Sequence, residues 1–114
     1  PNMRGSGYSF GEKQNRGFLH DNHLKIVMRS HQLAMEGYQY FFSSPEQQAK
    51  NGTKGDLLLI WSAPNYMYTS NNMATVCKFN FSGFPKYHLV EFGPEENRIQ
   101  PPGGARDSLS QYFV

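Results

Sequence analysis

Three short segments of the sequence contain residue types that could bind an anionic ligand or a metal. The first is Arg4-Gly5-Ser6-Gly7-Tyr8, in which an arginine stands beside two glycines. Glycines let the backbone come close to a ligand, and the planar guanidinium of Arg4 could contact two phosphate oxygens at once. The alternative is a surface turn with a solvated arginine, because most arginines lie at protein surfaces.

The second segment is Arg29-Ser30-His31-Gln32, which follows the apolar stretch LKIVM. A histidine just beyond a buried strand is held rigidly and can direct its imidazole at a metal or a substrate. The alternative is a hydrogen-bonded structural histidine. The chain has one cysteine, Cys77, and lacks a closely spaced ligand pair on each side of a possible site, so the sequence gives little support for a structural zinc site.

The third segment is Ser62-Ala63-Pro64-Asn65-Tyr66, which follows the apolar run LLLIW. Small residues and a proline-fixed bend could form a loop that aims the Tyr66 hydroxyl into a cleft. The alternative is a tight turn whose tyrosine covers the edge of the core.

The elements that would position these segments form an α+β fold with one helix and mostly antiparallel strands. The best helix candidate is Gly11–His23, with Phe18 and Leu19 on its apolar side. Between the second and third strands, Ser43–Asp56 is polar and contains proline and glycine, which predicts a long exposed hairpin loop. The expected strands are Leu24–Ser30 (buried on most of both faces), Gln39–Phe42, Leu57–Trp61, Ala74–Phe81 and Tyr87–Phe92, with a turn at Gly83-Phe84-Pro85.

Composition excludes several function classes. The net charge is +2 with both signs mixed along the chain, which argues against nucleic acid as a partner. No apolar run approaches the roughly 20 residues of a membrane helix, so we expect no membrane partner. The single cysteine favours a reducing compartment, the cytoplasm or the nucleus. The aromatic pairs at Tyr40–Phe42 and Phe79–Phe81 could stack nucleic-acid bases, but aromatics at strand positions are more often core.

Taken together, four segments resemble a known family in order and spacing: RGSGYSFG from Arg4, LKIVMRSHQLAMEGYQYFF from Leu24, WSAPNYMY from Trp61 and NMA from Asn72. They are similar to the C-terminal third of the metal-dependent phosphoprotein phosphatases, and most of all to the type 2A-like catalytic subunits. The resemblance implies the C-terminal part of a four-layer αββα, calcineurin-like metallophosphatase sandwich. It also implies a catalytic-domain portion over residues 1–93, followed by a Pro/Gly-rich tail over residues 94–114.

The implied activity is hydrolysis of phosphoserine and phosphothreonine in proteins. By this resemblance, His31 matches a ligand of a two-metal centre, and Arg4 and Tyr66 match residues that bind the substrate phosphate. The metals would be manganese, or alternatively iron or zinc, and the partners phosphoprotein substrates and regulatory or scaffold subunits. The family's carboxylate-rich metal motifs are missing from this sequence. We therefore expect no catalytic residue in this chain and no activity from the chain alone.

The sequence also departs from the family pattern. Met67 stands where the type 2A-like members have a cysteine, so thiol-directed inhibitors would find no target in this loop, and Met67–Asn71 lacks the usual arginine and glycine. The Ser43–Asp56 segment is longer than usual, and Val114 stands in place of a methylated leucine. These departures leave one alternative function open, a degenerate phosphatase homologue that acts as a binding or scaffold protein.

Overall fold

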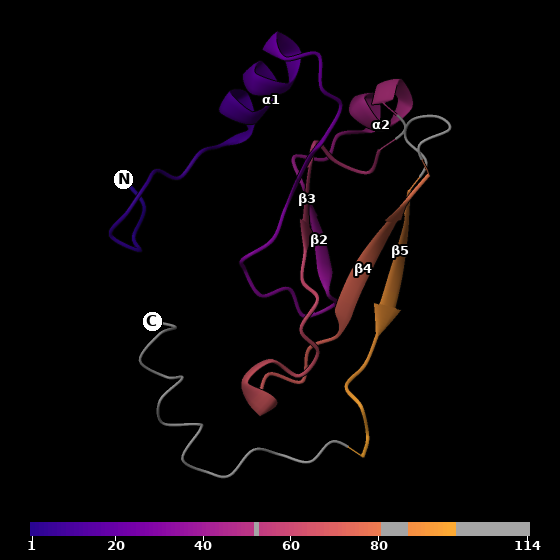
Figure 1. The fold of residues 1–114 in the computed structure, drawn as a ribbon. Coiled ribbons are helices and arrows are strands. Elements are labelled where there is room, and N and C mark those ends of the chain that lie inside the picture. Colours follow the sequence, from indigo (N-terminus) through magenta and orange to yellow (C-terminus); the bar gives the residue numbers. More distant parts are fainter. Residues whose placement is uncertain (52, 81–86, 98–114) are drawn as a thin grey trace.

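The computed structural model describes residues 1–51, 53–80 and 87–97, and within them are two small sheets with two helices toward one end of the strands (Figure 1). The elements, in chain order, are α1 (Glu12–Asp21), β1 (Val27–Arg29), β2 (Tyr38–Phe41), α2 (Pro45–Asn51), β3 (Leu57–Ile60), the 3₁₀ turn η1 (Tyr66–Tyr68), β4 (Ala74–Phe79) and β5 (Tyr87–Phe92).

Strand β3 is the centre of the first sheet, whose strand order is β1-β3-β2. β1 pairs with it in parallel and β2 in antiparallel fashion, with Leu58 opposite both Met28 and Tyr40. Leu57, Leu58 and Leu59 are each 2% exposed or less, because a central strand with elements on both faces takes apolar residues at every position. This three-leucine run is the main part of the core.

Helix α1 is fixed to this sheet through the residue that precedes β3. The carboxylate of Asp56 is 2% exposed and accepts a hydrogen bond from Arg16 Nε at 3.0 Å. The backbone oxygen of Asp56 accepts two more, from Asn15 Nδ2 at 3.2 Å and from the Val27 N–H at 3.1 Å. Asp56 therefore connects β3 to both α1 and β1 through its hydrogen bonds.

The second sheet pairs β4 with β5 antiparallel, and it is joined to the first sheet at two points. At one end, the Trp61 N–H donates to the Gly37 oxygen at 2.7 Å, and the Thr75 N–H donates to the Trp61 oxygen at 2.8 Å. At the other end, the hydroxyls of Tyr40 and Tyr87 lie 2.7 Å apart. Figure 1 shows the two sheets side by side as a result.

The α+β class is confirmed, but the prediction of a hairpin loop over Ser43–Asp56 is wrong. Residues Pro45–Asn51 form α2, whose first turn includes Glu46, and the Gln48 N–H donates to the Ser44 oxygen at 3.0 Å. Serine followed by proline and glutamate is a helix-start pattern, since proline suits the first helical position. The end of the segment is buried as well, with Thr53 at 2% and Asp56 at 1% exposure.

Several expected boundaries were too long. The strand predicted over Leu24–Ser30 is confined to Val27–Arg29, is half-buried, and leaves Leu24 48% exposed. In α1 the buried residues are Asn15 and Leu19, whereas Phe18 is 54% exposed. The strands at Gln39–Phe42, Leu57–Trp61 and Tyr87–Phe92 lie within a residue of their predicted ends.

The predicted turn at Gly83-Phe84-Pro85 and most of the predicted tail lie outside the described residues, so the boundary at residue 93 stays a prediction. In the part of the chain that is described, the helices are all too short or too polar to cross a membrane.

Candidate functional site

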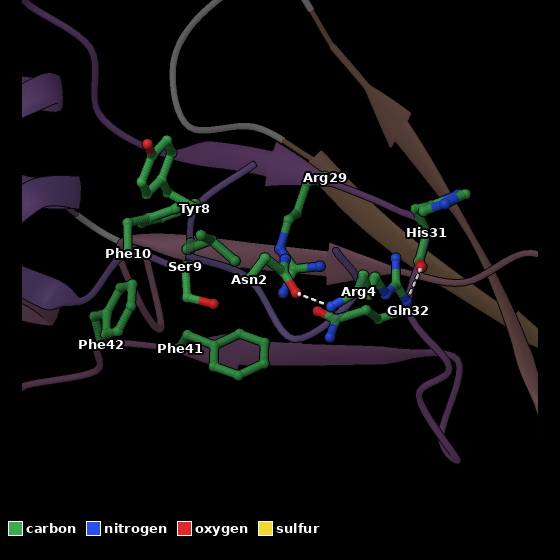
Figure 2. A pocket seen from close by; sticks show the side chains of 11 residues that line it. Asn2, Arg4, Tyr8, Ser9, Phe10, Arg29, His31, Gln32, Phe41 and Phe42 are labelled. Carbon is green, nitrogen blue, oxygen red and sulfur yellow. Dashed lines mark hydrogen bonds between the residues drawn. The ribbon is translucent and has the colours of Figure 1, made fainter. Parts of the chain in front are cut away.

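An open pocket of about 470 Å³ lies between the N-terminal segment and the first sheet (Figure 2). Two of the predicted site residues, Arg4 and His31, line it together although they are 27 positions apart in the sequence. Arg29 adds a second guanidinium, and none of the described lining residues is acidic. The other lining residues are Asn2, Tyr8, Ser9, Phe10, Gln32, Phe41, Phe42 and Leu57.

Arg4 is presented by a tight turn that depends on its neighbouring glycines. Gly5 and Gly7 have φ values of +82° and +71°, a region that glycine adopts at little cost. The turn is closed by Asn2, whose side-chain Oδ1 accepts the Arg4 N–H at 3.0 Å and whose N–H donates to the Gly7 oxygen at 3.0 Å. The Arg4 guanidinium then reaches the His31 carbonyl oxygen, with Nη2 at 3.4 Å.

His31 follows β1 by two residues and has a φ of +78°. For a non-glycine residue this left-handed conformation costs on the order of 1–3 kcal/mol, and such strain is concentrated at functional sites. The residue is exposed, and in Figure 2 its imidazole extends away from the two guanidinium groups. Within residues 1–51, 53–80 and 87–97, no three His, Cys, Asp or Glu side chains gather into a potential metal site.

Arg29 was not singled out as a site residue from the sequence, although it is the last residue of β1 and lines the same pocket. Its guanidinium carbon lies 5.7 Å from the centre of the Phe41 ring, a cation–π arrangement. Burial lowers the pKa of Arg29, and the nearby positive charge of Arg4 lowers it further. The sequence signal was its position, at the end of an apolar strand and two residues before His31.

Tyr66 lies apart from this pocket, at the start of η1. Its ring packs edge-on against Trp61, with centroids 4.7 Å apart. Asn65, Met67, Tyr68 and Asn71 all have positive φ values, so the loop is backbone-strained over most of its length.

This loop is held by Asn72, which sequence reasoning did not single out as a site residue. Asn72 is fully buried, and its Oδ1 accepts the Tyr66 N–H at 2.8 Å. Its Nδ2 donates to the oxygens of Ala63 and Met73, both at 2.8 Å. The structure therefore brings Arg4 and His31 together in one pocket and holds Tyr66 in a separate, strained loop.

Comparison with known proteins relates nearly the whole chain to one class of enzyme. It is 38% identical over 111 residues to the serine/threonine-protein phosphatase ppe1 of Schizosaccharomyces pombe, covering 97% of this chain and 32% of that protein. It is 34% identical over 111 residues to the serine/threonine-protein phosphatase sitA of Aspergillus fumigatus, covering 97% and 26%. No family model matches the chain.

The fold gives the same result. A solved serine/threonine phosphatase from Saccharomyces cerevisiae, described as similar to human phosphatase PP5, superposes with a TM-score of 0.60 at 26% identity. It covers 90% of this chain and 30% of that structure. The chain therefore shares the α+β fold of a part of a solved serine/threonine phosphatase. Sequence and structure together confirm its resemblance to the phosphoprotein phosphatase family of serine/threonine protein phosphatases. It spans about a third of the length of the curated relatives it matches.

Proposed function

We propose that this chain supplies one wall of the active site of a protein serine/threonine phosphatase, in which Arg4 binds the phosphate of the substrate. The observation that carries the proposal is that Arg4 and Arg29 line one pocket, with no acidic residue among the described residues that line it. A phosphate dianion is attracted to such a site, and a guanidinium can donate two parallel hydrogen bonds to its oxygens.

His31 and Tyr66 have the other two proposed roles. His31 would be a metal ligand, and Tyr66 would contact substrate from the strained loop after Trp61. The described residues do not themselves form a metal site, since His31 is a single donor with no second and third ligand beside it. Manganese, or alternatively iron or zinc, would therefore require ligands from outside the described residues. For that reason we expect the isolated chain to have no phosphatase activity.

Phosphoproteins are the proposed substrates, since the relatives are named as serine/threonine-protein phosphatases. Regulatory or scaffold subunits, a cytoplasmic or nuclear location and absence of nucleic-acid partners are further proposals from the resemblance and the mixed charge. The alternative of a degenerate, purely scaffolding homologue is supported by the altered Met67–Asn71 loop alone.

A chimera tests the proposal directly. The segment of the Schizosaccharomyces pombe phosphatase ppe1 that aligns with this chain would be replaced by residues 1–114, and hydrolysis of phosphoserine and phosphothreonine peptides would be measured with manganese present. We expect an active chimera that loses about 10²-fold or more in kcat/KM on Arg4→Ala, the usual effect of removing a donor to developing charge.

Lys13→Ala is the matched control, because Lys13 is an exposed cation on α1 outside the pocket. An inactive but folded chimera would favour the scaffold alternative. Hydrolysis by residues 1–114 alone would contradict the assignment of catalysis to residues outside this chain.

A further inference from the structure

The pocket that contains Arg4 has two chemically different ends. Figure 2 shows Tyr8, Phe10 and Phe42 gathered toward one end and Arg4, Arg29, His31 and Gln32 toward the other, with Phe41 between them. Tyr8 is 81% exposed and Phe10 52% exposed, so these rings present apolar surface to solvent. Exposed aromatic surface beside a cationic site is typical of a binding surface.

Arg29 is the residue that joins the two ends. Its guanidinium lies 5.7 Å from the centre of the Phe41 ring, which restricts its rotamers and leaves its N–H groups available to a ligand. Its single hydrogen bond within the described residues is a long one, from Nη1 to the Ser30 oxygen at 3.5 Å, and it makes no ion pair there. Arg4 lines the same pocket, so the two guanidinium groups can donate to one bound anion.

We propose that this pocket binds a phosphorylated residue through Arg29 as well as Arg4, and that its aromatic end selects substrates with an apolar side chain two positions from that residue. This inference rests on the proposed function, because it assigns a substrate class to the same site. Arg29 is a phosphate-binding residue in this proposal, and Phe10 is a specificity-determining residue.

The dimensions fit such a ligand. Pockets for ligands of this size have volumes of roughly 300–1,000 Å³, and this one has about 470 Å³. Side chains of an extended peptide alternate between its two faces, and residues two positions apart share a face at a spacing of about 6.6 Å. A phosphoserine and a leucine two positions away can therefore occupy the two ends of one pocket. Two guanidinium groups can together neutralise a phosphate dianion, whereas one leaves a net charge of −1 in a partly desolvated site.

The first experiment measures binding by residues 1–114, so it does not depend on catalysis. The probes are phosphoserine peptides with leucines or with serines two positions before and after the phosphoserine, and the unphosphorylated leucine peptide. We expect Arg29→Met to weaken binding of the phosphorylated leucine peptide by about tenfold or more, the usual effect of losing a charged hydrogen bond. Arg29→Lys would recover part of the lost affinity, because lysine keeps the positive charge but lacks the planar guanidinium.

The second variant tests the aromatic end. The wild-type chain should prefer the leucine peptide over the serine peptide by about fivefold or more, as expected for burial of apolar side chains. Phe10→Ser should abolish that preference while leaving affinity for the serine peptide unchanged. Phe18→Ser and Lys78→Met are the matched controls. Phe18 is 54% exposed, almost the same as Phe10, and Lys78 is an exposed cation on β4, and neither lines this pocket.

The outcomes separate this inference from the proposed function. If Arg4→Met abolishes binding but Arg29→Met matches Lys78→Met, the role of Arg29 is wrong and the proposed function stands. If Phe10→Ser and Phe18→Ser have the same leucine preference, the selection by the aromatic end is wrong. If the binding preferences hold but the ppe1 chimera is inactive, the inference is supported and the proposed catalytic function fails.

Discussion

The side-chain oxygen of Asn72 accepts the backbone N–H of Tyr66 at 2.8 Å, so a fully buried amide fixes the start of the loop that follows Trp61. The same side chain donates to the Ala63 and Met73 oxygens. The backbone oxygen of Asn72 accepts the Asn65 N–H at 2.9 Å. Two of the three side-chain hydrogen bonds of Asn72, those with Tyr66 and Ala63, hold this loop. The strained residues of the loop persist because Asn72 compensates for them.

Asn72→Ala should release this loop and destabilise the protein by about 3 kcal/mol, because several buried polar groups lose their partner. The measurement is urea unfolding followed by Trp61 fluorescence, which also reports the edge-on contact between Trp61 and Tyr66 in the native baseline. Ser62→Ala, an exposed position in the same loop, is the control. Equal unfolding midpoints for the two variants would show that Asn72 does not anchor the loop.

A second prediction concerns Gly37, where the two sheets meet. Gly37 has a φ of +82°, and a Cβ there would lie 2.5 Å from Thr75 Oγ1 and 2.6 Å from the Ala74 carbonyl carbon. Gly37→Ala should therefore destabilise the protein by about 3 kcal/mol or more, since both the conformation and the contact oppose it.

The opposite result is expected at Gly17, inside α1, where a Cβ would meet nothing within 4 Å. Gly17→Ala should stabilise the protein by about 1 kcal/mol through helix propensity. Thermal unfolding of both variants beside the wild type measures the contrast, and a shift of the same sign in both would refute this account of Gly37.

Local sequence patterns correctly predicted those elements in which every residue favours the same secondary structure. The run from Leu57 was recognised as a buried strand because its leucines are buried whichever face they occupy. The Ser43–Asp56 segment was misread because its polarity outweighed a local helix-start signal at Ser44 and Pro45. Composition could not show that Asp56 is buried, because its partner Arg16 lies 40 residues away in the sequence.

The candidate site was predicted unevenly for a similar reason. Arg4 and His31 stand beside residues that mark a turn or a strand end, so their local sequence already pointed to a site. Arg29 and Asn72 matter because of contacts made in three dimensions, with Phe41 and Arg4 for the former and with Tyr66 for the latter. No local pattern reports such contacts.

The ion pair between buried Asp56 and partly exposed Arg16 leads to a third prediction. Asp56→Ala would leave Arg16 without its buried partner and would remove the carboxylate that ties α1 to β3. Breaking a fully buried pair costs about 3–5 kcal/mol, and because Arg16 is 38% exposed we expect a smaller loss of about 2 kcal/mol. Glu12→Ala, which removes only the exposed partner of Arg16 at 2.6 Å, should cost about 0.5 kcal/mol. Urea unfolding distinguishes the two, and comparable losses would mean that burial of Asp56 contributes little.

The last prediction is a pH dependence that comes from the junction between β2 and β5. Burial, and then the hydrogen bond with the Tyr87 hydroxyl, raises the pKa of Tyr40 above its ordinary value of 10.0. The folded protein thus keeps the proton of Tyr40 at pH values where the unfolded chain loses it. The resulting stabilisation is complete below pH 10 and is lost as the pH rises from there through the folded-state pKa.

The free energy of unfolding should therefore fall above pH 10, by less than about 1.4 kcal/mol per pH unit because the ring is only partly buried. Tyr40→Phe should make that decline shallower, whereas Tyr8→Phe, at a residue 81% exposed, should leave the slope unchanged. Urea unfolding of the three proteins between pH 8 and pH 11 measures the slopes. An identical slope for wild type and Tyr40→Phe would show that the hydroxyl pair of Tyr40 and Tyr87 does not make the free energy of unfolding depend on pH.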